Sequence, residues 1–436
     1  MRFKIFVAVF IFLFLVLAIG SFTEKKSDEE GESIENEELE DDGVDEEEGK
    51  DVESEATKPV DVSDTTVTIA AGAHIATDAD QQPVEIKRDA DVDIQKVADA
   101  DSEMADSDID SGETVACIPD ETRYVPCDHV AGKLQMQVCS SKKVWEDERD
   151  CFEKPPVAEM VSVSAGSFWM GSKTTENNRK EDEIRHFVQI SHDYSVGKYE
   201  VTQGLFTAVM GYNPSHFKNC GKQCPVEMVS WHEAIKYANE LSKIEHLSPC
   251  FDCQGKGASV ICTLKKEYGT PQDCSGYRLP TEAEWEMAAR AGTNTAYYNK
   301  RESTGNGSDG SLAPIAWYAN NSSASYDGGV DCSDWFDGAD KCGSQPYGKK
   351  SPNDFDLYDM SGNVDEWTMD FYQSTYPDGT ESEPLVDPRG AEQGSSHVIR
   401  GGSWASLAGK CRSASSGQAS AGSRTNQIGF RLAKSE

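Results

Sequence analysis

Within the C-terminal half of this 436-residue chain stands the run YRLPTEAEWE, residues 277–286. Its Thr281 and Glu284 have the spacing of a capping box, in which a hydroxyl and a carboxylate three residues apart bond to the first free amides of a helix. Small and apolar residues follow at helical spacing, at Trp285, Ala288 and Ala289. The run therefore predicts a helix that begins directly after Thr281.

A second capping box precedes another helical pattern. Ser230 and Glu233 lead into apolar residues at positions 234, 237, 238 and 241, which lie on one face of a helix. Helical periodicity is confined to these two places, and short extended runs such as 187–190 and 397–399 alternate with Gly, Asn and Ser turns elsewhere. Two helices, short strands and long loops predict an α+β domain whose loops carry its function.

Six further motifs flank the first run in a fixed order: VSAGSFWMG at 163–171, KYEVT at 198–202, PVEMVSW at 225–231, DMSGNVDEW at 359–367, RGGSW at 400–404 and IGFR at 428–431. Together the seven motifs resemble those of the formylglycine-generating, sulfatase-modifying family, and the resemblance covers roughly residues 156–436. It implies a C-type-lectin-like fold. It does not settle function, because the family contains oxidases, iron enzymes and binding proteins.

In the copper oxidases of this family, two cysteines after the Gly-Gly-Ser motif hold Cu(I). The resemblance places Ser406 at the first position and Cys411 at the second. Cu(I) is a soft ion that needs thiolates, and a serine hydroxyl is a hard donor. We therefore expect copper to be absent and oxidase activity to be lost or badly impaired.

The candidate catalytic residues are Cys411, Ser406 and Ser403, which aligns with the family serine beside the metal. Each has a simpler interpretation. A lone buried cysteine is more often a small apolar filler than a nucleophile or a ligand. A Gly-Gly-Ser sequence is also ordinary turn chemistry.

The resemblance also implies a structural calcium ion. Asp359 and Glu366 would supply carboxylates, and Gly362 and Val364 would supply carbonyl oxygens, as suits a hard cation. The alternative is a turn that is merely rich in acidic side chains. Asp365 fits that alternative, because it stands where the family usually has a tryptophan that lines the substrate groove of the oxidases.

The formal net charge is -36, and residues 24–116 alone hold 33 acidic and 7 basic side chains. This balance offers no basic surface to nucleic acid. The segment has too little apolar surface to offset the entropy of ordering, so residues 23–113 are predicted to be a disordered acidic linker. The alternative is an acidic tail that binds cations.

Residues 1–22 begin with a basic group and continue into an apolar run, 5–19, that ends near small residues. This is the pattern of a secretory signal peptide. The alternative is an uncleaved N-terminal anchor, which alone would bring the chain to a membrane. Either interpretation predicts an exported protein that is secreted, periplasmic or on the cell surface.

Thirteen cysteines in an exported chain predict a disulfide framework. Four of them fall in a small Cys-rich module, residues 114–153, and allow two bridges there. Local pairs at 220/224 and 332/342, with two bridges among positions 250, 253, 262 and 274, would leave Cys411 as the odd thiol. Spacing alone does not fix this pairing.

These features predict an exported, degenerate family member that displays a domain at 156–436 and binds an unknown protein or glycan, without copper oxidase activity. The alternative is a formylglycine-generating type of oxidoreductase that acts on a sulfatase cysteine and uses Cys411 in an altered site.

Overall fold

The helix predicted after Thr281 is α3, Glu282–Arg290. A computed structural model of the chain describes residues 117, 119, 121–128, 130–305, 307–334 and 339–436. Both halves of the predicted capping box are present, and the Thr281 side chain accepts from the backbone N–H of Glu284. The predicted signal segment, 1–22, and the whole of the predicted acidic linker, 23–113, lie outside the described residues.

The second predicted helix is α2, Trp231–Ile244, and its Ser230–Glu233 capping box is also complete. The sequence-based expectation of only two helices was wrong, because α1 spans Gln203–Met210. Thr202 caps its N-terminus through Leu205 N–H, and Gly211 ends it in the left-handed conformation. This helix has no capping-box carboxylate and is only 8 residues long, so periodicity gave little sign of it.

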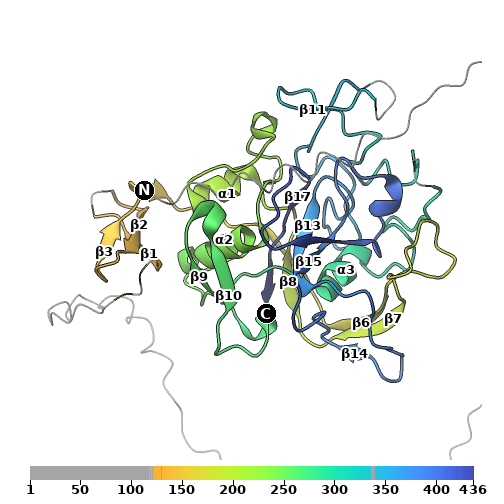
Figure 1. The fold of residues 1–436 in the computed structure, drawn as a ribbon, viewed down its shortest axis with the longest axis horizontal. Coiled ribbons are helices and arrows are strands. Elements are labelled where there is room, and N and C mark those ends of the chain that lie inside the picture. The colour runs from red at the N-terminus through yellow and green to blue at the C-terminus, as the bar shows by residue number, and fades with distance from the viewer. Residues whose placement is uncertain (1–116, 118, 120, 129, 306, 335–338) are drawn as a thin grey trace, which may run out of the picture. The chain divides into compact units, whose positions relative to one another are not determined.

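The largest sheet of the family-like region has the order β16-β15-β13-β17, in which only β13 and β17 are parallel. Its strands are β13 (Asp365–Phe371), β15 (Ser396–Arg400), β16 (Ser416–Ser420) and β17 (Ile428–Gly429). Figure 1 shows α3 beside β15, and α3 contacts both β13 and β15. The motifs at 277–286, 359–367 and 400–404 therefore meet at this sheet.

Two three-stranded sheets complete the framework, with the orders β14-β7-β6 and β18-β8-β5. Their strands are β5 (Met160–Val163), β6 (Gly166–Met170), β7 (His186–Ile190), β8 (Tyr194–Gly197), β14 (Leu385–Val386) and β18 (Ala433–Ser435). Strands β7 and β15 confirm the extended runs predicted at 187–190 and 397–399. The predicted α+β class is likewise confirmed.

The loops contain further short strands and 3-10 turns. Two hairpins pair β9 (Phe251–Gln254) with β10 (Ile261–Leu264), and β11 (Val330–Asp331) with β12 (Lys341–Cys342). Single 3-10 turns are η1 (Lys218–Cys220), η2 (Gly257–Ser259), η3 (Pro271–Asp273) and η4 (Ala408–Lys410).

The Cys-rich segment forms its own four-stranded sheet from β1 (Thr122–Pro126), β2 (Lys133–Cys139), β3 (Trp145–Asp147) and β4 (Phe152–Glu153). It contains two disulfides, Cys117–Cys139 and Cys127–Cys151. So small a sheet buries little apolar surface, and the two bridges substitute for a larger core.

The remaining disulfides follow the distribution expected from the sequence. They are Cys220–Cys224, Cys250–Cys274, Cys253–Cys262 and Cys332–Cys342. Cys411 is the free cysteine, and it is buried. No helix within the described ranges is long and apolar enough to cross a membrane.

Four fully buried arginines pair with glutamates: Arg278 with Glu284 inside one motif, Arg400 with Glu286 and Arg431 with Glu366 between motifs, and Arg412 with Glu176 and Glu183 of the segment between β6 and β7. A buried charge without a partner is strongly destabilising, so the last three arginines fix which segments must meet. The loops around the candidate site are held in place by these pairs.

Candidate functional site

The turn at 359–367 is built around a close backbone contact. Gly362 has φ +80°, and a Cβ atom there would lie 2.2 Å from the carbonyl oxygen of Trp317. Asn363 is also left-handed at φ 64°, a conformation that asparagine tolerates better than most residues. The side-chain nitrogen of Asn363 donates to Glu200 at 2.7 Å, and its side-chain oxygen accepts from the backbone N–H of Gln345 at 2.8 Å.

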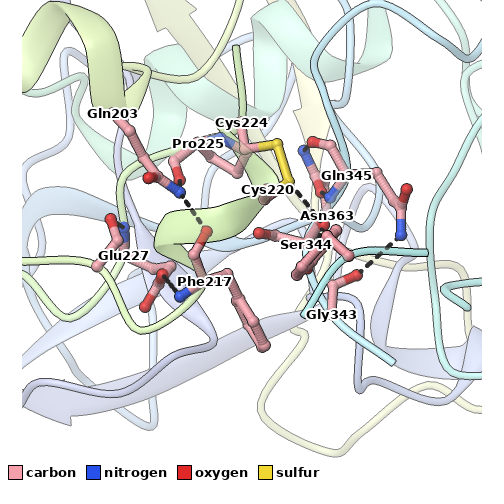
Figure 2. Close-up of a disulfide and its surroundings, with 12 residues drawn as sticks. Gln203, Phe217, Cys220, Cys224, Pro225, Glu227, Gly343, Ser344, Gln345 and Asn363 are labelled. Atoms are coloured by element: carbon pink, nitrogen blue, oxygen red, sulfur yellow. Dashed lines mark hydrogen bonds between the residues drawn. A yellow bond between two sulfur atoms is a disulfide. The ribbon is translucent and has the colours of Figure 1, made fainter. Parts of the chain in front are cut away.

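Figure 2 shows how the neighbouring Cys220–Cys224 disulfide joins this framework. The Sγ atom of Cys220 lies 3.2 Å from the carbonyl oxygen of Ser344, beside the Gln345–Asn363 contact. Buried Glu227 accepts from Phe217 N–H at 2.9 Å, and burial raises the pKa of Glu227 to about 7.

The ring of Phe217 meets Trp404 edge to face at 5.2 Å. Through this ring contact, the disulfide-bonded loop packs against the Gly-Gly-Ser-Trp segment. The contact gives the loop a structural role.

The four residues predicted to bind calcium lie in one region, and the two carboxylates among them have different partners. Glu366 accepts from Arg431 at 2.6 Å through both carboxylate oxygens, and from the indole N–H of Trp285 at 2.7 Å. Asp359 accepts from Gly348 N–H through one oxygen, while its other oxygen is buried without a partner. Burial, with a smaller contribution from Glu366, raises the pKa of Asp359 to about 6.

The backbone of this loop is engaged as well. The N–H of Val364 donates to Glu200 at 3.1 Å, and that of Gly362 donates to the carbonyl oxygen of Gly401 at 2.9 Å. Within the described part of the chain, no three His, Cys, Asp or Glu side chains are grouped to hold a metal ion. Calcium at this loop stays a prediction, and Glu366 could serve as a ligand only after leaving Arg431.

The three candidate catalytic residues share one small region. The N–H of Ser403 donates to the hydroxyl of Ser406 at 3.0 Å, and the two hydroxyls lie 3.2 Å apart. Cys411 is completely buried, and a Cβ atom on Gly402 would lie 2.8 Å from its Sγ. Gly402 therefore allows the Gly-Gly-Ser turn to cover the thiol.

The environment of Cys411 favours the neutral thiol. Burial raises its pKa well above its ordinary value, and the nearby Asp365 carboxylate raises it further. A soft metal or an electrophile requires the thiolate. The burial of Cys411 fits the interpretation as an apolar filler, and its catalytic role stays a prediction.

A pocket of about 410 Å³ opens over this turn. Its lining includes Asp365, Ser406 and Gly402, joined by Lys180, Asp182, Tyr372, Ile399, Lys410, Ser415, Ser416, Gly417, Gln418 and Gln427. Polar side chains predominate, and they come mainly from the segment between β15 and β17. The pocket suits a small hydrated ligand better than an apolar one.

Asp365 lies half-buried in this pocket, where the family usually has tryptophan. Burial raises the pKa of Asp365 to about 7, against the opposing influence of Lys410 and of hydrogen bonds from Gly402 and Ser403. Its charge therefore changes near neutral pH. Asp365 thus gives the pocket an ionisable side chain where the family resemblance predicts an apolar tryptophan.

Sequence reasoning found Ser403, Ser406 and Cys411, which the structure brings together. It missed Lys180, Asp182 and the two glutamines at 418 and 427, which line the same pocket. Of the additional charged residues that line the pocket, Lys410 was the one that the sequence could have indicated, because it directly precedes Cys411. Lys180 and Asp182 lie more than 200 residues away in sequence, and no motif marks them.

The family model described as "Sulfatase-modifying factor enzyme 1-like domain" matches residues 147–436. The chain is 34% identical over 309 residues to the formylglycine-generating enzyme of Mycobacterium tuberculosis, which covers 63% of this chain and 97% of that enzyme. It is 32% identical over 260 residues to the chaperone protein LppX of Paenibacillus barcinonensis, which covers 57% of this chain and 79% of that protein.

A third relative is the serine/threonine-protein kinase pkn1 of Chlamydia pneumoniae, 29% identical over 67% of this chain. The match spans 40% of that kinase's length. Among solved structures, Treponema denticola variable protein 1 is 28% identical with a TM-score of 0.48, covering 72% of this chain and 99% of that one.

Proposed function

Because the chain belongs to the sulfatase-modifying factor enzyme 1-like domain family, we propose that it is a ligand-binding member of that family without copper oxidase activity. The observation that carries this proposal is the state of the two positions at which the oxidases hold copper. Ser406 replaces the first cysteine, and Cys411 is buried beneath the Gly402 turn.

The contacts of these two residues support the proposal. The Ser406 hydroxyl is engaged by Ser403, and the Cys411 Sγ lies 3.9 Å from the carbonyl oxygen of Leu407 inside the core. A neutral hydroxyl and a neutral buried thiol make a poor pair of ligands for Cu(I). The surface over these residues is the polar pocket.

We assign ligand binding to that pocket, with a protein or a glycan as the partner. A scaffold held by disulfides and buried ion pairs presents the pocket's loops, and loops on a rigid scaffold are where recognition residues usually lie. Fold membership alone does not supply this function, because the family holds several chemistries.

Copper binding and turnover test the proposal directly. The purified chain should bind no Cu(I) tightly and should leave a sulfatase-derived cysteine peptide unconverted. Ser406→Cys should improve Cu(I) binding, since it adds a thiolate near the pocket surface, and Ser403→Ala serves as a control that adds no sulfur. Strong formylglycine production by the unmodified chain would refute the proposal.

An oxidoreductase function is the second candidate, favoured by the 34% identity that spans 97% of the mycobacterial enzyme. In that case Cys411 would have to become exposed and lose its proton. Loss of measured turnover in Cys411→Ala, with retained folding, would identify it as the surviving catalytic thiol.

We also propose that the chain is exported. Six disulfides within the described residues support this assignment, because such bonds persist in oxidising compartments. Fractionation of the native host should find the protein outside the cytoplasm. A fully reduced cytoplasmic form would contradict the assignment.

A further inference from the structure

Two lysines that lie far apart in the sequence line the same pocket. Lys180 lies in the loop between β6 and β7, and Lys410 ends the turn η4 directly before Cys411. The Lys180 ammonium donates to the carbonyl oxygen of Ser416 at 2.7 Å, and Lys410 lies near enough to lower the pKa of Lys180. Both side chains line the pocket.

Buried ion pairs enforce this approach. Arg412, two residues after Lys410, pairs with Glu176 at 2.6 Å and with Glu183 at 2.7 Å. These two glutamates lie on either side of Lys180 in the sequence. The loop that carries Lys180 is thus fastened to the segment that carries Lys410, and the two cations are held together by the fold.

Neither lysine forms a salt bridge with a described residue that would account for this proximity, although Lys410 lies near enough to Asp365 to lower the pKa of that carboxyl. No ion pair within 4 Å involves Lys180 or Lys410 among the residues that the structure describes, although Asp182 and Glu183 lie near enough to influence Lys180. Burial, followed by the neighbouring Lys410, lowers the pKa of Lys180 to about 8. The fold therefore maintains an unfavourable contact that an anion would relieve.

The acidic side chains of the pocket are engaged elsewhere. Asp365 accepts from Gly402 and Ser403, and one oxygen of Asp182 accepts from the hydroxyl of Tyr372 at 2.8 Å. The other oxygen of Asp182 is buried without a hydrogen-bond partner. It is free to accept from a ligand donor.

We propose that Lys180 and Lys410 form a two-lysine clamp for the anionic group of an acidic sugar, and that Asp182 accepts from one of its hydroxyls. This inference rests on the ligand-binding function proposed above and names the ligand class of the same pocket. The carboxylate or sulfate would lie between the two ammonium groups, which are the natural partners of such oxyanions.

The lining favours a sugar over an acidic peptide. Ile399 is the single aliphatic side chain larger than a methyl among the lining residues, so the pocket offers little to an apolar peptide side chain. Hydroxyls and amides at Ser406, Ser415, Gln418 and Gln427 are suited to hydroxyl groups. The volume of about 410 Å³ lies within the range of small-ligand pockets.

Titration calorimetry with glucuronate, galactose 6-sulfate and neutral glucose tests the clamp. The wild-type chain should bind at least one of the two acidic sugars and bind glucose at least about tenfold more weakly. Lys180→Met and Lys410→Met should each weaken acidic-sugar binding by about tenfold or more, as expected for loss of a charged hydrogen bond. Methionine keeps the apolar length of lysine, and Lys349→Met, at an exposed position outside the pocket, should leave binding unchanged.

The opposite results have separate meanings. Equal binding of glucose and of the acidic sugars, unchanged binding in both pocket variants, or binding of neither acidic sugar overturns the clamp. Binding of a Glu-rich peptide in place of both acidic sugars overturns the sugar assignment. The proposed function fails separately, if the same preparation binds Cu(I) and converts a cysteine peptide. Thermal melts of each variant confirm that a lost interaction is not lost folding.

Discussion

Arg431 holds both carboxylate oxygens of Glu366 at 2.6 Å, and both side chains are fully buried. Arg431 comes from the Gly-Phe-Arg motif near the C-terminus, while Glu366 lies in β13, within the motif at 359–367. The indole N–H of Trp285 in α3 donates to the same carboxylate at 2.7 Å. One buried carboxylate thus joins three of the motifs by which the family resemblance was first seen.

Removing one member of this pair should be costly. We expect Arg431→Met to lower the free energy of unfolding by about 3–5 kcal/mol, because it leaves Glu366 buried without its counterion. Urea denaturation followed by fluorescence measures the change. Lys256→Met is the matched control, since it breaks an exposed pair with Glu148 and should cost no more than about 1 kcal/mol. Equal losses in the two variants would contradict this role for Arg431.

The thiol of Cys411 should be unreactive in the folded protein. A thiol reagent such as dithionitrobenzoate, added without reductant, should detect no free thiol in the native chain and one after unfolding, because the other twelve cysteines are paired. Ser406→Cys provides the matched control, since its new sulfur would line the pocket and should react without unfolding. Rapid modification of the native wild-type chain would show that the Gly402 turn opens.

Asp365 should make stability fall as pH rises. Its folded pKa of about 7 lies above the roughly 3.9 of an unfolded aspartate. The folded state therefore binds the extra proton between these values, and the stabilisation is present below about pH 4 and lost as pH rises through 7.

We expect the stability of Asp365→Asn relative to wild type to increase across that window, by roughly 1–3 kcal/mol once partial exposure is allowed for. Urea unfolding of both proteins at intervals from pH 4 to 8 measures the difference. Comparing the two cancels the buried acids at 200, 227, 359 and 370, whose pKa values are also raised. A difference that stays constant with pH would contradict the raised pKa.

A calcium ion at this loop would have to compete with Arg431 for Glu366. Because the carboxylate is already satisfied, we expect melting temperature to be the same in calcium and in a chelator. A ligand that binds only the folded state would raise it by mass action. A fall on chelation that disappears in Asp359→Ala would establish the calcium ion predicted from the family resemblance.

The sequence predicted those parts of the fold that rest on local chemistry. Helices α2 and α3 were found because their capping boxes lie within four consecutive residues. Helix α1 was not, because Thr202 caps it without a partner carboxylate. Ser403, Ser406 and Cys411 lie in one small region because one short turn holds all three, and their catalytic role stays a prediction.

The rest of the site depends on contacts between distant segments. Lys180 reaches the pocket because Arg412 binds Glu183 across 229 residues of sequence. Asp359 and Glu366 belong to one motif, but their acidity did not reveal that Arg431 would bind Glu366. Spacing identifies residues that are neighbours in sequence, and it says little about which counterion a buried charge selects.

The residues that line the pocket and the buried residues that stabilise the fold lie on the same segment, but they are different residues. From the end of β15 to β17, the buried residues include Arg400, Trp404 and Arg412, while Ser406, Lys410, Gln418 and Gln427 line the pocket. Exchanges among the second group would leave the anchoring pairs in place. Substitutions during evolution could therefore change what this surface recognises without disturbing the contacts that stabilise the fold.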